Sequence, residues 1–283
     1  IQPYFVYVNQ TAFNEAGIEV PSEWTWDEFY EIAGQLTTGE GPTKTFAAMF
    51  PRWPYTNELA YYERGWDFNV NPEECTTNFD DSIWIDVINV RANAEVDLEV
   101  AIPYADIRAG DVRLANELYN NRISMAIGGT WVLSATLDQE GFPRDFMTSF
   151  APMPSLDEDG YTYRPGKLED WYAVASNSEN PAEAVQFMEW FLTEGYEPMI
   201  ADGRFSTWAG YTAEDQARLF LPEGVEEVMD VQAFQQVVLG DEREFSTPLV
   251  LIGNAEIETI FRDQAIRVLA GELTAEEAVA IIQ

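Results

Sequence analysis

Aromatic side chains in turn-rich stretches are the residues of this sequence whose type and placement suggest chemistry. Most stand beside proline or glycine, outside the periodic segments: Trp53, Tyr55, Trp66, Trp131, Trp171 and Trp208. Loop-borne Trp and Tyr are common where a flat apolar ligand face is stacked, such as the C–H face of a sugar ring. Packing in a satellite core is the alternative for each ring. Trp24 and Trp26 flank a helix start, and we expect them to be structural.

Reagents for catalysis are scarce in this chain. It has no histidine and a single cysteine, Cys75, which excludes Ser-His-Asp and Cys-His catalysis, imidazole zinc sites and an internal disulfide. Glu169 and Asp170, ahead of Trp171, are a candidate glycosidase pair, but among 50 acidic residues solvated surface acids are the plainer interpretation. Phosphate-binding glycine loops and metal-spaced clusters are absent from the sequence. We therefore predict no enzymatic activity, no cofactor and no metal.

The acidic charge describes the surroundings more than the ligand. Fifty Asp and Glu against 15 Lys and Arg give a net charge of −35. Nucleic acid and anionic lipid would be repelled, so neither is an expected partner. The only lysines are Lys44 and Lys167. An acidic surface poor in lysine favours a protein from a salty environment, with an ordinary acidic secreted protein as the alternative.

Strands and helices alternate along the first half of the chain. Residues 4–8 (YFVYV) predict a buried strand, and Thr25 with Glu28 forms a capping box that opens a helix. Residues 123–127 predict a strand that runs into Gly128 and Gly129, and 150–154 (FAPMP) an edge strand ending in prolines. This alternation predicts an α/β fold.

The second half follows the same pattern. Residues 172–175 predict a short strand, and Pro181 opens a helix with an apolar side expected to be buried. That side consists of Phe187, Met188, Phe191 and Leu192. A helix over 257–269 is followed by a second capping box, Thr274 with Glu277, at the start of the last helix.

Five stretches in a fixed order carry a resemblance to a known family. They are residues 7–29 (YVNQ through Gly17 to WTWDEF), 121–131 (NRISMAIGGTW), 150–154 (FAPMP), 171–191 (with SNSENP) and 269–278 (LAGELTAEEA). In this order and spacing they resemble the family 1 extracellular solute-binding proteins of ABC importers, the sugar-binding, maltose-binding-protein-like branch. The resemblance spans essentially the whole chain.

The resemblance implies a two-lobe periplasmic-binding-protein-like fold of class II, with ligand bound between the lobes and a hinge closing over it. Residues 1–172 and 226–283 would form the C-terminal lobe, and 173–225 would return to an N-terminal lobe of which most is missing from this sequence. It further implies an extracytoplasmic monomer, lipid-anchored through the missing N-terminus, that delivers a small solute to a membrane permease.

The resemblance also implies a ligand site. Trp131, after the glycine pair, matches the aromatic residue that stacks a sugar ring. The expected further contacts are Trp53 and Tyr55 in an aromatic loop, Gly128 and Gly129 where backbone approaches ligand, Asp170 and Trp171 at the second crossing, and Trp66.

The ligand class stays partly open at this point. Near Gly253 and Asn254 the further stacking tryptophan of maltose binders is absent, which disfavours a maltodextrin and leaves a mono- or oligosaccharide as the expectation. A polyamine, polyol or peptide ligand, a sensory or adhesion module, and a glycoside-active enzyme are the alternatives.

Overall fold

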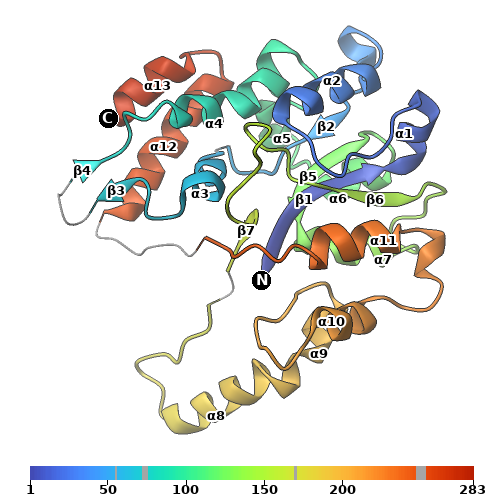
Figure 1. The fold of residues 1–283 in the computed structure, drawn as a ribbon, viewed down its shortest axis with the longest axis vertical. Helices are drawn as coiled ribbons and strands as arrows, with labels where there is room; N and C mark the ends of the chain where they lie inside the picture. Colours follow the sequence, from blue (N-terminus) through green and yellow to red (C-terminus); the bar gives the residue numbers. More distant parts are fainter. Residues whose placement is uncertain (55, 72–75, 169–170, 247–252) are drawn as a thin grey trace.

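A mixed β-sheet lies at the centre of the protein, and the strand β1 runs through its middle (Figure 1). The computed structural model describes residues 1–283 apart from 55, 72–75, 169–170 and 247–252. Within this part the main sheet has five strands in the order β2-β5-β1-β6, with β7 also paired to β1. β2 pairs with β5 in parallel, and β1 pairs with β5, β6 and β7 in antiparallel register. The strands are β1 (Gln2–Asn9), β2 (Ala48–Met49), β3 (Val70–Asn71), β4 (Thr76–Thr77), β5 (Met125–Gly129), β6 (Thr148–Pro152) and β7 (Gly166–Lys167).

Helices cover both faces of this sheet and also form a separate lower extension (Figure 1). The α-helices are α1 (Gln10–Ala16), α2 (Trp26–Leu36), α3 (Glu58–Arg64), α4 (Ile83–Ala92), α5 (Tyr104–Ala109), α6 (Leu114–Tyr119), α7 (Leu133–Leu137), α8 (Pro181–Phe191), α9 (Glu197–Ala201), α10 (Ala213–Phe220), α11 (Val231–Ala233), α12 (Asn254–Leu269) and α13 (Ala275–Ile282). The 3-10 helices are η1 (Gly41–Thr43), η3 (Thr130–Val132), η4 (Glu194–Tyr196) and η5 (Val225–Glu227), and the π-helices are η2 (Asn93–Asp97) and η6 (Phe234–Leu239).

The two faces of β1 belong to two different cores. Val6 and Val8 point into a first core with α2, α4, α12 and α13, whereas Phe5 and Tyr7 point into a second core with α6, α9, α10 and η6. Successive side chains of a strand alternate between faces, so an unbroken apolar strand must be covered on both sides. The result is a layered α/β fold, as the sequence predicts.

The sequence-predicted helix starts are confirmed. Thr25 and Glu28 form a reciprocal capping box at α2, and Thr274 and Glu277 form another at α13. Trp24 and Trp26 are both 4% exposed, which fits their expected structural role. β5 and β6 lie two residues away from their predicted positions, and β6 is the edge strand that its prolines predict.

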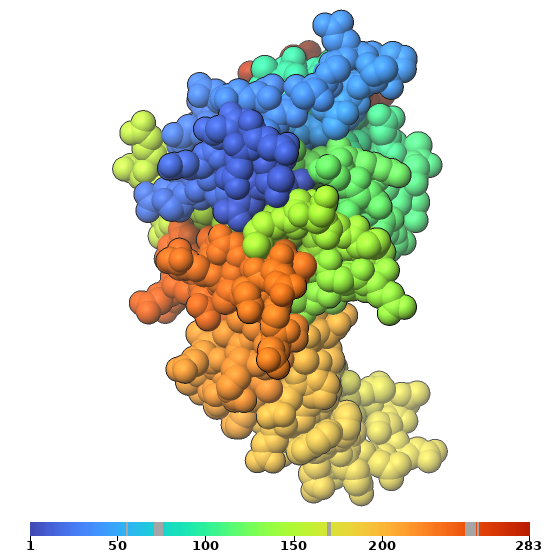
Figure 2. Space-filling model, turned by 90° about the vertical axis from the view of Figure 1, so that its right-hand side faces the viewer, coloured from blue at the N-terminus to red at the C-terminus, as the bar shows by residue number. Residues whose placement is uncertain are grey.

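Two predictions near α8 are wrong. Residues 172–175 form no strand, because nothing in the described part of the chain pairs with them and a strand needs a partner for its backbone hydrogen bonds. α8 itself exists, but it has no buried residue, and Phe187 is 59% exposed. Phe191 and Leu192 still pack partly against the second core. Figure 2 shows why the rest stays exposed: the yellow segment that contains α8 extends from the lower end of the molecule.

Candidate functional site

Three aromatic side chains from separate segments meet at the end of the sheet where β1 begins and β5 ends. Tyr4 comes from β1, Trp53 from the loop after β2, and Trp131 from η3, directly after β5. The Trp131 ring stands perpendicular to Tyr4 at a centroid distance of 5.3 Å and edge-on to Trp53 at 5.5 Å, and Tyr4 and Trp53 are 6.4 Å apart. These are favourable edge-to-face separations. We call Tyr4, Trp53 and Trp131 the aromatic platform.

The platform presents mainly one ring to the exterior. Trp131 is 39% exposed, Trp53 is half-buried and Tyr4 is buried. These two neighbours therefore fix the edge of the Trp131 indole while part of that ring remains open. An exposed aromatic ring held in this way is suited to stacking against a flat apolar surface.

The glycine pair explains how Trp131 reaches this position. A Cβ on Gly129 would lie 2.3 Å from a ring carbon of Trp131, so only glycine lets the indole pack against the backbone there. The Gly129 carbonyl accepts a hydrogen bond of 2.8 Å from the Tyr7 hydroxyl, which fixes the end of β5. Gly128 is less constrained, since its nearest neighbour would be Leu114 Cδ1 at 3.3 Å. Both glycines are buried, and their predicted role in ligand approach remains a prediction.

An ion pair borders the platform. The ammonium of Lys167, on β7, lies 3.2 Å from a carboxylate oxygen of Glu58, the first residue of α3. The same ammonium lies 5.7 Å from the Tyr4 ring centroid and 6.0 Å from that of Trp53, within the range of cation–π attraction. Aromatic faces therefore stand beside a hydrogen-bond donor and an acceptor, the combination that a polyhydroxylated ring requires.

The cavity beside these residues is too small for a sugar ring. It has a volume of about 40 Å³ and is lined by Tyr4, Trp53, Glu58, Thr56 and Arg91 together with mainly apolar side chains. A single water needs about 10–15 Å³ of such volume, so the cavity holds only a few water-sized groups. A ring-sized ligand would have to lie against the outer face of Trp131.

Of the other predicted aromatic contacts, Trp66 and Trp171 do not join the platform. Trp66 stacks on Tyr61 at 4.4 Å and packs against the first core. Trp171 is 79% exposed, in the segment that leads to α8. Tyr55 and Asp170, and the alternative acid Glu169, lie outside the described residues.

Sequence reasoning missed Tyr4, Glu58 and Lys167 as members of this site. Tyr4 reads as an ordinary core residue of a buried strand. One signal was available for Lys167, because it is one of only two lysines in a chain of 283 residues. The sequence gives no such signal for Glu58, because it is one of many acidic residues and lies 109 positions from Lys167.

A much larger hollow, of about 1040 Å³, lies elsewhere, along the edge of β6. It is lined by residues 19–25, 158–161 and 232–243 in part, and seven carboxylates face it: Glu19, Glu23, Glu28, Glu158, Asp159, Asp230 and Asp241. Its tryptophan, Trp24, is buried and donates to the Pro152 carbonyl. None of the platform residues lines this hollow.

Across the described ranges, no helix is both long and apolar enough for a membrane crossing.

The fold and this aromatic end of the sheet define a class of protein, the solute-binding proteins of the two-lobe α/β type. Residues 1–198 match the family of bacterial extracellular solute-binding proteins, and the chain belongs to that family. This is a family of binding proteins and not of enzymes. No curated protein matches the sequence.

Solved structures of the same fold are similar to the chain over nearly its whole length. An ABC substrate-binding protein from Listeria monocytogenes in complex with cycloalternan has a TM-score of 0.75 at 17% identity, covering 99% of this chain and 68% of that one. A solute-binding protein from Thermotoga lettingae bound with α-D-tagatose has a TM-score of 0.68 at 20% identity, with the same coverages. A chitin oligosaccharide binding protein has a TM-score of 0.73 at 18% identity, again covering 99% and 68%. At such identities the likeness establishes the fold.

Proposed function

We propose that this protein captures a carbohydrate on the aromatic platform and delivers it to the permease of an ABC importer. The observation that carries this proposal is the partly open Trp131 ring, fixed edge-on by Tyr4 and Trp53. The C–H face of a pyranose or furanose ring packs on such a surface. The carbohydrate ligands named for the three similar structures support the same choice.

The ion pair at the platform narrows the ligand to uncharged sugars. Lys167 supplies a donor and Glu58 an acceptor, and their opposite charges balance each other at a distance of 3.2 Å. A neutral hydroxyl can bond to either group without leaving a charge unpaired, whereas a charged ligand would compete with one partner. The ammonium also lies over the Tyr4 and Trp53 rings, where it already makes the cation–π contacts that a polyamine would otherwise make with those two rings.

In this proposal the platform forms one wall of the ligand cleft. Residues 1–172 and 226–283 build one lobe, and 173–225 are the segment that returns to the other, with α9 and α10 packed on the second core of the first lobe. The isolation of α8, which buries none of its residues, is consistent with a segment that packs elsewhere in the whole protein. Trp171, at the boundary of that segment, would then face the ligand from the crossing.

A thermal-shift screen of the whole protein tests the function. The panel contains neutral mono- and oligosaccharides, with a uronic acid, glucosamine, spermidine and amino acids as matched charged controls. A ligand at a hundred times its dissociation constant adds about 2.7 kcal/mol of stability. We expect shifts of several degrees from neutral sugars alone. A response to spermidine or amino acids with silence from every sugar would overturn the proposal.

The acidic surface leads us to propose a working environment of high salt. Screening shortens the reach of surface repulsion to about 3 Å at 1 M ionic strength, so self-repulsion among the 35 excess negative charges should fade. The melting temperature should therefore rise from low to molar salt. A flat or falling curve would count against a salty source.

A further inference from the structure

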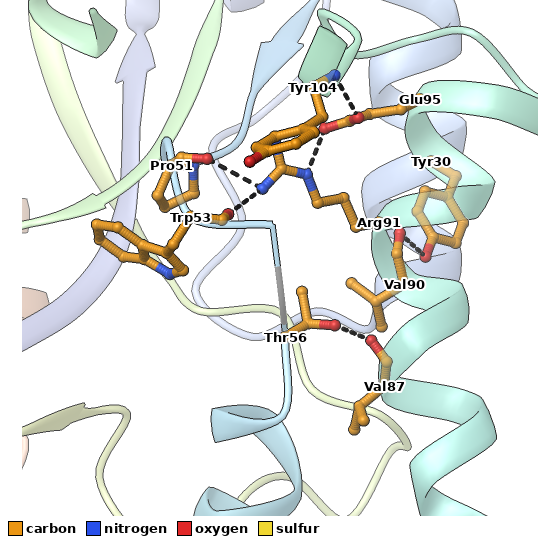
Figure 3. Close-up of polar contacts among 9 residues, drawn as sticks. All are labelled: Tyr30, Pro51, Trp53, Thr56, Val87, Val90, Arg91, Glu95 and Tyr104. Carbon is orange, nitrogen blue, oxygen red and sulfur yellow. Dashed lines mark hydrogen bonds and ion pairs between the residues drawn. The ribbon is translucent and has the colours of Figure 1, made fainter. Parts of the chain in front are cut away.

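A buried ion pair lies beside the loop that carries Trp53 (Figure 3). Arg91, on the last turn of α4, is 1% exposed, and Glu95, on the π-helix η2 that continues α4, is 4% exposed. The Arg91 Nε–H donates to a carboxylate oxygen of Glu95. The other oxygen of Glu95 accepts a hydrogen bond of 2.7 Å from the backbone N–H of Tyr104, which fixes the carboxylate in turn.

The same guanidinium holds the loop. Arg91 Nη1 donates to the carbonyl of Pro51 at 3.0 Å and to the carbonyl of Trp53. Phe50 and Tyr104 rings lie 5.3 and 5.2 Å from the guanidinium carbon and confine it further. Two alternate carbonyls of one short loop are therefore bonded to a single nitrogen, Nη1, while Nε of the same planar group bonds Glu95. An ammonium carries all its donors on one nitrogen and cannot span both sets of partners in this way.

The loop is also attached to α4 at its far end. The Thr56 hydroxyl donates to the carbonyl of Val87, one turn of helix before Arg91 (Figure 3). Pro51 and Pro54 lack an N–H, so they cannot add backbone donors of their own to hold the loop. The position of Trp53 against Trp131 thus depends on α4, to which the loop is joined at both ends.

Stability alone does not account for this pair. Burial lowers the pKa of Arg91 and raises that of Glu95, each shift offset in part by the partner's charge. Removing two ions from water costs so much that an apolar replacement of a buried pair is often neutral or stabilising. The main contribution of such a buried pair is therefore the position that it fixes for its neighbours. Here it fixes the position of Trp53, a residue of the aromatic platform.

We infer that Arg91 and Glu95 are positioning residues of the ligand site: the pair fixes the Trp53 carbonyl and thereby holds the indole in place on the platform. The part of the inference that concerns ligand binding rests on the proposed function. The part that concerns the position of the Trp53 ring does not depend on any ligand. The Trp53 and Trp131 indoles lie 5.5 Å apart, close enough for their electronic transitions to interact. We expect this interaction to give a pair of bands of opposite sign in the far-ultraviolet circular dichroism spectrum, which we call the tryptophan couplet.

The decisive variant is the double substitution Arg91→Met with Glu95→Gln in the whole protein. It leaves no unpaired buried charge, and the glutamine oxygen can still accept from Tyr104. We expect a melting temperature within a few degrees of wild type, a loss of the tryptophan couplet to the extent seen in Trp53→Phe, and about tenfold weaker binding of triacetylchitotriose, equivalent to about 1.4 kcal/mol. Arg91→Lys, which keeps the charge but not the fork, should lose the couplet as well.

Arg144→Met is the matched control. Arg144 also donates to two backbone carbonyls, that of Phe142 in a loop and that of Thr136 on α7, and it also lies over aromatic rings, but in the second core. The Arg144→Met variant should leave the tryptophan couplet and the sugar affinity unchanged, whatever its melting temperature. An intact couplet in both Arg91 variants would overturn the inference. A lost couplet in a protein whose wild type binds no sugar would instead support the positioning role and count against the proposed ligand class.

Discussion

The aromatic platform and a second surface with exposed aromatic side chains are built differently. The aromatic platform joins rings from three segments that are far apart in the sequence, with the Lys167–Glu58 pair beside them. The second surface, which we call the α8 surface, consists of Trp171, Tyr172, Phe187, Trp190 and Phe191. Four of its rings contact one another at 5.5–5.8 Å, and all five come from a single stretch of chain.

The comparison teaches that exposure by itself does not identify a ligand site. Trp190 is 52% exposed and Trp131 only 39%, yet Trp131 is the ring with fixed neighbours on both sides. A ligand site needs rings whose geometry is set before binding, because ordering them afterwards costs affinity. The platform has this preorganisation through Gly129 and the Arg91–Glu95 pair, whereas the rings of the α8 surface are held mainly by α8 and the residues next to it in the sequence.

Removing the support of the platform should have the largest effect. Arg91→Met alone leaves Glu95 buried without its partner, and breaking a buried pair in this way costs about 3–5 kcal/mol of unfolding free energy. Chemical denaturation measures this loss. A cost below about 1 kcal/mol would mean that water reaches Glu95 and that the platform has no rigid base.

Removing the open ring should come next. Trp131→Ala should weaken sugar binding by about 1–3 kcal/mol with little loss of stability, because the ring is partly exposed. Isothermal titration calorimetry and thermal melting of the same sample separate the two effects. Normal binding together with a much lower melting temperature would make Trp131 a core residue.

Displacing that ring without deleting it should have a similar or smaller effect. In Gly129→Ala the new Cβ would meet the Trp131 ring at 2.3 Å, so the indole must move, and such overpacking costs about 1–3 kcal/mol. Gly128→Ala is the neighbouring control, with its closest contact at 3.3 Å. Only Gly129→Ala should reduce sugar affinity, and equal losses in both variants would contradict this account of the glycine pair.

The smallest effect is expected on the α8 surface. Trp171 is 79% exposed, so Trp171→Ala should change the unfolding free energy by less than about 0.5 kcal/mol. Its loss of sugar affinity should be smaller than that of Trp131→Ala, as measured by the same calorimetry. An equal or larger loss would show that the platform is not the main stacking surface.

Much of the fold could be predicted because its signals are local. The capping boxes at Thr25 and Thr274 satisfy backbone groups within one turn, and the unbroken apolar run of β1 requires cover on both faces. The wrong predictions depended on distant partners. Residues 172–175 have the composition of a strand, but no strand lies beside them in the described chain. The apolar side of α8 packs against few other residues of the described chain.

The site could be predicted only in part, for the same reason. Trp131 and Trp53 stand out as aromatics beside glycine and proline, and a resemblance to a family added to that signal. Glu58 and Lys167 meet only through the fold, and so do Arg91 and the carbonyl of Trp53, 38 positions apart. Such contacts between distant residues leave no periodic pattern in the sequence.

The central claim is that a sugar ring lies on the face of Trp131, and proton NMR of the bound sugar tests it most directly. Protons held over an indole are shifted upfield by its ring current. With the neutral sugar that stabilises the protein most in the thermal-shift screen, in excess over the whole protein, we predict upfield shifts confined to the C–H protons on one face of one ring, and their disappearance in Trp131→Ala. Upfield shifts that persist unchanged in Trp131→Ala would contradict the claim.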